Sequence, residues 1–228
     1  MYMEKHIAKQ TVLPRWRGFN MEDMFHSRNA DKRRNADEDY PLIADLGFDF
    51  IRIPCSYRLW SSAEDPFSVR EEGLARLDSM VQLCQDNGLH ANICLHRIPG
   101  YCINDDEPVK EKASLFTDEE MQEAAAFQWE MLAKRYQDIS CDKLSFNVVN
   151  EPEHYVTMWQ YKCLINKVVD RVHQVTPDRL FVVDGMMVGD IPPVLSMIDH
   201  ARENLAYSCR GYTPRSVSHY TRDRKSVV

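Results

Sequence analysis

One segment of the chain combines a buried-strand pattern with side chains that can carry a proton. Residues 145–151 contain the apolar residues Phe146, Val148 and Val149 and end in Asn150 and Glu151, and Pro152 follows directly. Because proline lacks the N–H that a central strand needs, the strand is predicted to end there. A carboxylate at the carboxyl end of a buried parallel strand is well placed for acid–base catalysis. Glu151 is therefore the candidate catalytic group, and the alternative is an ordinary surface glutamate that begins a loop.

Length, composition and charge restrict the class of protein. The 228 residues are 44% hydrophobic, which is enough for the packed core of one large domain. A net charge of −7 argues against nucleic acid as a partner. Residues 1–10 do not resemble a signal peptide, and no run approaches a membrane span, so no membrane partner is expected. These features favour a cytoplasmic protein.

The cysteines support the same compartment. Seven of them are scattered along the chain without a Cys-x-x-Cys pair. An odd number at irregular spacing favours free thiols over a disulfide framework or a zinc site. The sequence therefore predicts no structural metal.

Strand-like and helix-like segments alternate along the chain. Strands are predicted at 16–20, 50–54, 90–96, 144–151, 180–185 and 205–212. Helices are predicted over 74–84, from a capping box formed by Thr117 and Glu120, over 158–175, and over 193–203, whereas 31–39 is predicted to be a loop. Strands separated by helices require a parallel sheet, either doubly wound or part of an eight-stranded barrel. No Gly-x-Gly-x-x-Gly follows the first strand, so dinucleotide binding loses its main support.

Polar side chains recur where the predicted strands end. They are Asn20, Arg52, His96, Asn150, Glu151, Arg210 and Tyr212. Each has a structural alternative: Arg52 could be a buried ion-pair partner, His96 a satisfied core histidine, and Tyr212 a packing ring. Five strands that deliver polar groups to one end of a sheet are harder to explain by packing. That end is where barrel active sites assemble.

Four motifs together resemble glycoside hydrolase family 5, the cellulase family of retaining (β/α)8 glycosidases. They are RGFN at 17–20, IRIP at 51–54, LHRIPG at 95–100 and NVVNEP at 147–152. The resemblance extends from about residue 15 to 220 in the order of the family. It implies an α/β fold, an incomplete TIM barrel with about six of the eight βα units present.

The resemblance also implies roles for the site residues. Glu151 would be the general acid/base and Asn150 would bind the sugar 2-hydroxyl. Arg52 would hold the catalytic carboxylates, while His96 and Tyr212 would line the −1 subsite with Asn20 as a supporting residue. The substrate would be a β-linked oligo- or polysaccharide, a β-glucan or mannan, and the mechanism needs no cofactor. Which glycan is cleaved and the oligomeric state stay open.

The chain departs from the family pattern in two places. Arg210 stands where many members carry histidine, and His219 with Tyr220 are the candidates to compensate. The second departure is larger, because a retaining glycosidase needs a second carboxylate about 5–5.5 Å from the first as its nucleophile. The family nucleophile is a glutamate that ends strand seven, and no Asp or Glu after Glu203 lies on a strand-like run.

The final residues prompt a separate expectation. Residues 223–228 can be back-translated into a common sequencing-adapter sequence, so residues 1–222 are expected to be a partial catalytic domain and 223–228 a non-native tail. Without strands seven and eight a barrel has open edges, and we expect no glycosidase activity from this chain. The alternative is a carbohydrate-binding pseudoenzyme. An unrelated αβ hydrolase is disfavoured because the chain has no Gly-x-Ser-x-Gly elbow.

Overall fold

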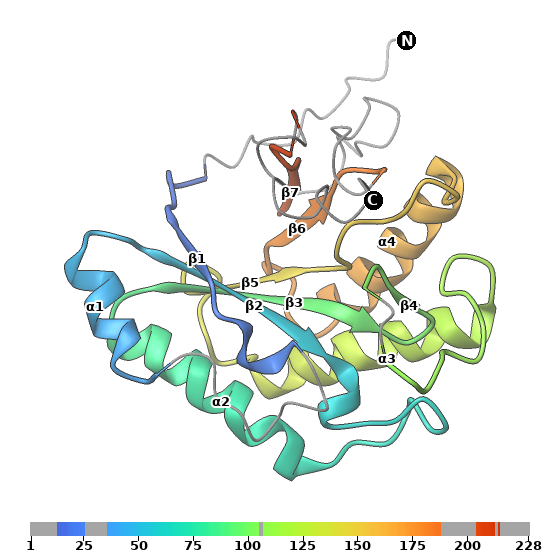
Figure 1. Ribbon diagram of the computed structural model, residues 1–228, viewed down its shortest axis with the longest axis horizontal. Coiled ribbons are helices and arrows are strands. Elements are labelled where there is room, and N and C mark those ends of the chain that lie inside the picture. The colour runs from blue at the N-terminus through green and yellow to red at the C-terminus, as the bar shows by residue number, and fades with distance from the viewer. Residues whose placement is uncertain (1–12, 26–35, 105–106, 188–203, 213, 215–228) are drawn as a thin grey trace, which may run out of the picture.

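A curved parallel sheet with helices on its outer side forms the body of the protein (Figure 1). The structure is a computed structural model, and it describes residues 13–25, 36–104, 107–187, 204–212 and 214. The parallel strands are β1 (Gly18–Asn20), β2 (Phe50–Ser56), β3 (His90–Ile98), β5 (Leu144–Asn147), β6 (Phe181–Asp184) and β7 (Leu205–Ser208). A two-residue strand, β4 (Tyr101–Cys102), pairs antiparallel with the end of β3.

The order of the strands distinguishes between the two sheet types that the sequence allowed. Along the sheet the order is β1-β2-β3-β5-β6-β7, the same as the order along the chain. A doubly wound sheet reverses direction at a switch point, whereas a barrel adds each new strand at the same edge. The sheet is therefore an incomplete barrel, as predicted, and β1 and β7 form its two edges within the described residues.

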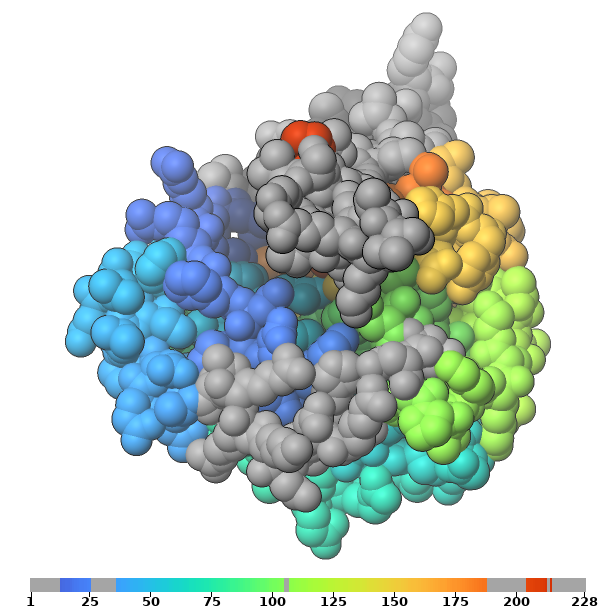
Figure 2. Space-filling model, viewed as in Figure 1, coloured from blue at the N-terminus to red at the C-terminus, as the bar shows by residue number. Residues whose placement is uncertain are grey.

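The helices cover the convex side of the sheet. They are α1 (Asp39–Asp45), α2 (Glu71–Asp86), α3 (Glu119–Arg135) and α4 (Met158–His173), with short 3-10 helices at Glu22–Met24 and Tyr57–Leu59. In the space-filling view α1, α2, α3 and α4 form the left, lower and right parts of the outer surface (Figure 2). Among the residues with described positions, no helix has the length and apolar character to cross a membrane.

Several local predictions were wrong. The capping box at Thr117 does not form, because the N-cap of α3 is Asp118, whose side chain accepts the N–H of Met121. The capping box that does form lies on α4, between Thr157 and Gln160. The predicted loop 31–39 overlaps α1, which begins at Asp39, and its residues 31–35 lie outside the described part of the chain.

Two strands end well before the predicted position. β5 ends at Asn147 rather than at 151, and β7 ends at Ser208 rather than at 212, so Asn150, Glu151, Arg210 and Tyr212 follow their strands rather than belong to them. The side chains of a strand alternate between the inner and outer faces of the sheet. Residues in the loop that follows are not bound by this alternation, so neighbouring residues can both face the axis of the barrel. The helix predicted over 193–203 falls outside the described residues.

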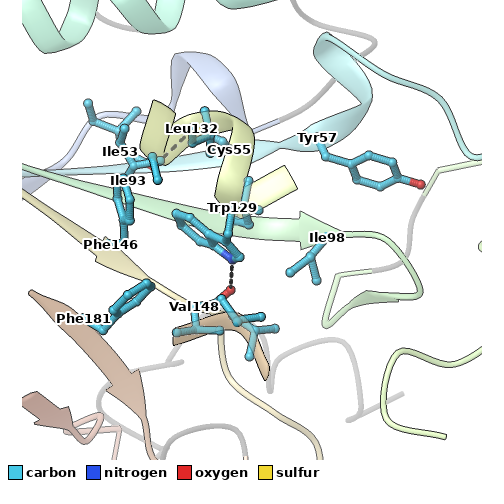
Figure 3. Packing of buried hydrophobic residues seen from close by; sticks show 14 of the residues in the cluster. Ile53, Cys55, Tyr57, Ile93, Ile98, Trp129, Leu132, Phe146, Val148 and Phe181 are labelled. Atoms are coloured by element: carbon cyan, nitrogen blue, oxygen red, sulfur yellow. Dashed lines mark hydrogen bonds between the residues drawn. The ribbon is translucent and has the colours of Figure 1, made fainter. Parts of the chain in front are cut away.

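Aromatic packing under β5 and β6 supports the segment that carries Glu151. The Trp129 ring on α3 lies 4.9 Å from the Phe146 ring and 6.2 Å from the Phe181 ring, between centroids. Its indole N–H donates to the carbonyl of Val148 at 3.0 Å, as Figure 3 shows. All four side chains are buried. The core of the domain therefore extends directly beneath residues 148–151.

Candidate active site

Glu151 lies after β5 with its carboxylate in contact with two side chains from the segment after β7. Its Oε1 accepts the hydroxyl of Tyr212 at 2.5 Å and Nε of Arg210 at 3.1 Å. The side chain of Glu151 is 12% exposed, so the carboxylate is largely sheltered from water but can still be reached. A sheltered, reachable carboxylate with fixed hydrogen bonds is suited to exchange a proton with a bound substrate.

The backbone of Glu151 has a conformation that few residues other than glycine adopt. Its φ is +46°, in the left-handed region. Two contacts hold it there: the N–H donates to Oδ2 of Asp184 at 3.1 Å, and the carbonyl accepts the hydroxyl of Tyr101 at 2.6 Å. Unfavourable backbone geometry persists where surrounding contacts enforce it, and it gathers at functional sites.

Buried ion pairs fix the loop that supplies Tyr101. Arg58 donates to Glu107 at 3.0 Å and to Glu111 at 2.5 Å. Glu111 in turn accepts the N–H of Gly100 at 3.1 Å, beside Tyr101. Because these carboxylates and the guanidinium are buried together, removing one partner would leave an uncompensated charge. The network therefore holds the turn between β3 and β4 in place against Glu151.

Asn150 joins the residues that come from three strands. Its Oδ1 accepts Nη2 of Arg52 at 2.8 Å and Nη2 of Arg210 at 3.2 Å. Its Nδ2 lies 3.1 Å from Nε2 of His96, which must be unprotonated to accept that N–H. Sequence reasoning predicted that Arg52, His96, Asn150 and Glu151 meet at one end of the sheet, and the structure brings them together with Arg210 and Tyr212.

Arg52 extends this network across the sheet. The same Nη2 lies 2.9 Å from Sγ of Cys94 and 2.9 Å from Oδ1 of Asn147. Asn147 links this network to β6, because its Nδ2 donates to the carbonyl of Val182 at 3.0 Å. Burial raises the pKa of the Cys94 thiol to about 12, so it stays a neutral thiol beside the guanidinium.

Burial also keeps His96 neutral. Desolvation, helped by the nearby cations Arg52, Arg210 and Arg97, lowers its pKa to about 3. Between about pH 3 and about pH 6.5 the unfolded chain therefore binds a proton on this ring that the folded chain does not. Stability associated with His96 is complete above this range and is lost as the pH falls through it.

We expect His96→Gln to flatten the acid side of the stability profile. Each such histidine contributes a slope of about 1.4 kcal/mol per pH unit. Urea unfolding at pH 4.5 to 7 should show a smaller slope for the variant than for the native chain. His154→Gln, which changes an exposed histidine, is the control and should keep the native slope. Equal slopes for native and His96→Gln proteins would mean that His96 is protonated in the folded state.

Asp184 is a buried member of the site that the sequence reasoning missed. Its Oδ1 accepts Nδ2 of Asn147 at 3.2 Å and the hydroxyl of Ser208 at 2.7 Å. Its Oδ2 accepts the N–H of Glu151 at 3.1 Å and Nη2 of Arg210. The signal was present, because Asp184 ends an apolar strand just as Glu151 follows one. The sequence predicts the strand 180–185, but none of the predicted site residues lies on it.

Burial and the neighbouring carboxylates determine the charges of Arg210 and Tyr212. Burial acts to lower the pKa of Arg210, but the carboxylates of Asp184 and Glu151 outweigh it and the pKa is raised overall. Burial raises the pKa of Tyr212 to about 12, and its hydrogen bond to Glu151 acts in the same direction. Arg210 is thus a permanent cation, and Tyr212 is a neutral hydroxyl that donates to Glu151.

Of the predicted residues that the structure describes, Asn20 is not joined to this network. Asn20 ends β1 and pairs in register with Arg52, but its side chain is exposed and no hydrogen bond links it to the other described site residues. His219 and Tyr220 lie outside the described residues. In the part of the chain with described positions, no group of three or more His, Cys, Asp or Glu is arranged to hold a metal ion.

Comparison with known proteins places this geometry in a family. The family model described as Cellulase (glycosyl hydrolase family 5) matches residues 7–227. Cellodextrinase A of Ruminococcus flavefaciens is 26% identical over 219 residues, covering 96% of this chain and 62% of the relative. Endoglucanase C of Acetivibrio thermocellus is 25% identical over 184 residues, covering 80% of this chain and 52% of that protein. The chain thus spans less than two thirds of these relatives.

Solved structures of glycoside hydrolases share the fold of this chain. A glycoside hydrolase crystal structure superposes with a TM-score of 0.81 at 32% identity, over 90% of this chain and 62% of the other. A Thermotoga maritima Cel5A structure with mannotriose has the same fold, with a TM-score of 0.71 at 19% identity, over 90% of this chain and 63% of that one. The family model covers nearly the whole sequence. The chain belongs to the cellulase family, glycosyl hydrolase family 5.

Proposed function

We propose that this chain provides the acid/base part of a retaining endo-β-glycosidase that hydrolyses a β-linked glucan or mannan. One observation carries the proposal: the carboxylate of Glu151, 12% exposed, lies in a fixed frame made by Tyr212, Arg210 and Asn150. The names of the relatives favour glucan, and the neighbour solved with mannotriose makes mannan the second substrate to examine.

In the proposed reaction Glu151 acts twice. It first gives its proton to the glycosidic oxygen while a second carboxylate attacks the anomeric carbon, so that the C–O bond breaks and a glycosyl ester forms. The resulting carboxylate then takes a proton from water, whose oxygen attacks the same carbon and releases the nucleophile. Asn150 uses one amide N–H on His96 and has a second one to offer to a sugar hydroxyl.

Asp184 does not fit the role of the second carboxylate. Both of its oxygens already accept two hydrogen bonds, and its side chain is 1% exposed. Beyond Tyr212 the printed sequence holds one acidic residue, Asp223. We therefore propose that residues 223–228 are not native, and that the residues that follow position 222 in the whole protein supply the nucleophile. Sequencing the source DNA through this point tests both statements.

A small anion offers a test that uses the 228-residue chain itself. Azide can take the place of the nucleophile: its nitrogen bonds to the anomeric carbon from the side opposite the leaving group. The C–O bond breaks, and Glu151 protonates the departing oxygen. With aryl β-cellobioside or aryl β-mannobioside we expect negligible turnover in buffer and an α-glycosyl azide as product when azide is added, detected by proton NMR.

The outcomes separate the candidate functions. Rapid hydrolysis without azide would contradict the proposal that the nucleophile lies outside these residues. Binding of cellotriose without turnover in azide would favour the carbohydrate-binding pseudoenzyme. A folded chain that neither binds sugars nor forms the azide adduct would overturn the glycosidase proposal.

A further inference from the structure

We propose that Asp184 is a positioning residue that supplies the counter-charge needed for an arginine to lie against the acid/base Glu151. This inference rests on the proposed function, because it concerns how Glu151 keeps a proton. Arg210 is a permanent cation that lies beside the candidate acid, with Nε 3.1 Å from Oε1 of Glu151. The residue that offsets that cation is Asp184, at the end of the neighbouring strand.

The contacts place Asp184 between the acid and the cation. Its Oδ2 accepts both the N–H of Glu151, at 3.1 Å, and Nη2 of Arg210. Arg210 reaches the carboxylate of Glu151 through a different nitrogen, Nε, at 3.1 Å. One guanidinium thus bridges two carboxylates, of which Glu151 is partly exposed and Asp184 is 1% exposed.

The charges explain why both carboxylates are needed. When Glu151 carries its proton, the charges of Arg210 and Asp184 cancel, and Arg52 is the remaining cation of the described network. Without the charge of Asp184, the protonated acid would face an uncompensated, largely buried cation, which favours loss of the proton. A general acid that has already lost its proton cannot assist a leaving group.

Asparagine is a suitable probe because it can keep the shape and most of the hydrogen bonds. With its oxygen turned toward Glu151 and Arg210, the amide nitrogen of residue 184 would face the hydroxyl of Ser208, which can accept as well as donate. Asn147 would keep its bond to the carbonyl of Val182, at 3.0 Å. Asp184→Asn therefore removes a charge with little loss of packing.

The test compares two leaving groups in azide buffer with the 228-residue chain. Phenyl β-cellobioside needs a proton to release phenol, whereas 2,4-dinitrophenyl β-cellobioside does not. For Asp184→Asn we expect turnover of the phenyl substrate to fall about 10-fold or more, within the range of acid catalysis. Turnover of the dinitrophenyl substrate should change little, and the alkaline limb of the phenyl pH profile should move to lower pH.

A double variant provides the rescue. Asp184→Asn combined with Arg210→Gln removes both charges, and we expect it to recover much of the turnover of the phenyl substrate. A purely structural role for Asp184 would lower both substrates equally and would not be rescued. Equal losses for the two substrates, or no recovery in the double variant, would overturn the inference.

An unfolding cycle keeps this inference separate from the proposed function. Urea midpoints are measured for the native chain, both single variants and the double variant. Asp184→Asn leaves Arg210 with Glu151 as its one described carboxylate partner, and the change at Arg210 leaves the buried Asp184 without a cation. We therefore expect the double variant to lose less than the sum of the two. Additive losses would overturn the pairing of Asp184 with Arg210 whether or not the chain turns over any glycoside. If the losses in stability were non-additive but the variants and the native chain turned over no glycoside, the pairing would stand and the proposed function would be contradicted.

Discussion

Glu151→Gln should reduce azide-assisted turnover of phenyl β-cellobioside by about 10²- to 10⁴-fold, the usual contribution of general acid catalysis. Glutamine has nearly the same shape and its oxygen can still accept the hydroxyl of Tyr212 and Nε of Arg210, so the frame around it should persist. It has no proton to give to the departing oxygen. The dinitrophenyl substrate, which needs none, should lose much less, and initial rates for the two substrates measure the difference.

Glu153→Gln is the matched control for that experiment. It changes a glutamate two residues further along the same loop, which has no contact with Arg210 or Tyr212 among the described hydrogen bonds and ion pairs. We expect it to retain native rates with both substrates. If Glu153→Gln caused the larger loss, or if Glu151→Gln slowed both substrates alike, Glu151 would not be the proton donor.

Trp129→Ala is expected to destabilise the domain by about 3–5 kcal/mol, a large part of the 5–15 kcal/mol typical of a folded domain. The indole is fully buried against Phe146 and Phe181. Its loss would leave a cavity and would also remove the hydrogen bond to the carbonyl of Val148. Urea or thermal unfolding followed by circular dichroism measures the change.

Trp159→Ala makes the same chemical change at a surface site. The Trp159 side chain is 75% exposed near the start of α4, so its removal should alter stability by no more than about 0.5 kcal/mol. The contrast between two tryptophans in one chain isolates burial as the cause. Similar effects for both variants would show that the Trp129 packing does not support the sheet as described.

The sequence predicted the sheet and most of the site because both depend on short, regular patterns. Apolar runs that end in polar residues marked the strands, and the ends of parallel strands meet at one edge of a sheet. This was enough to bring Arg52, His96, Asn150 and Glu151 together. The same patterns left a doubly wound sheet and a barrel open, and the barrel was implied by the family resemblance. The strand order of the structure, which follows the chain order, agrees with the barrel.

The remaining features depend on contacts that no local pattern encodes. The left-handed turn at Glu151 needs Asp184 and Tyr101, which lie 33 and 50 residues away in the sequence. The sequence places Asp184 on an apolar strand and does not show its partners. Its role follows from its contacts with Arg210 and Ser208, which only the structure shows. The N-cap of α3 lies one residue after the predicted one. Thr117 and Asp118 are both good N-cap residues, so the local sequence does not decide between them.

A crystal structure of the chain with cellotriose bound is the most direct test of Glu151 as the proton donor at the mouth of this barrel. We expect one glycosidic oxygen within hydrogen-bond reach of the Glu151 carboxylate, about 2.6–3.2 Å, with a sugar hydroxyl near Asn150. This result does not depend on turnover. Sugar bound elsewhere, with the Glu151 carboxylate turned away from Tyr212 and Arg210, would contradict the account.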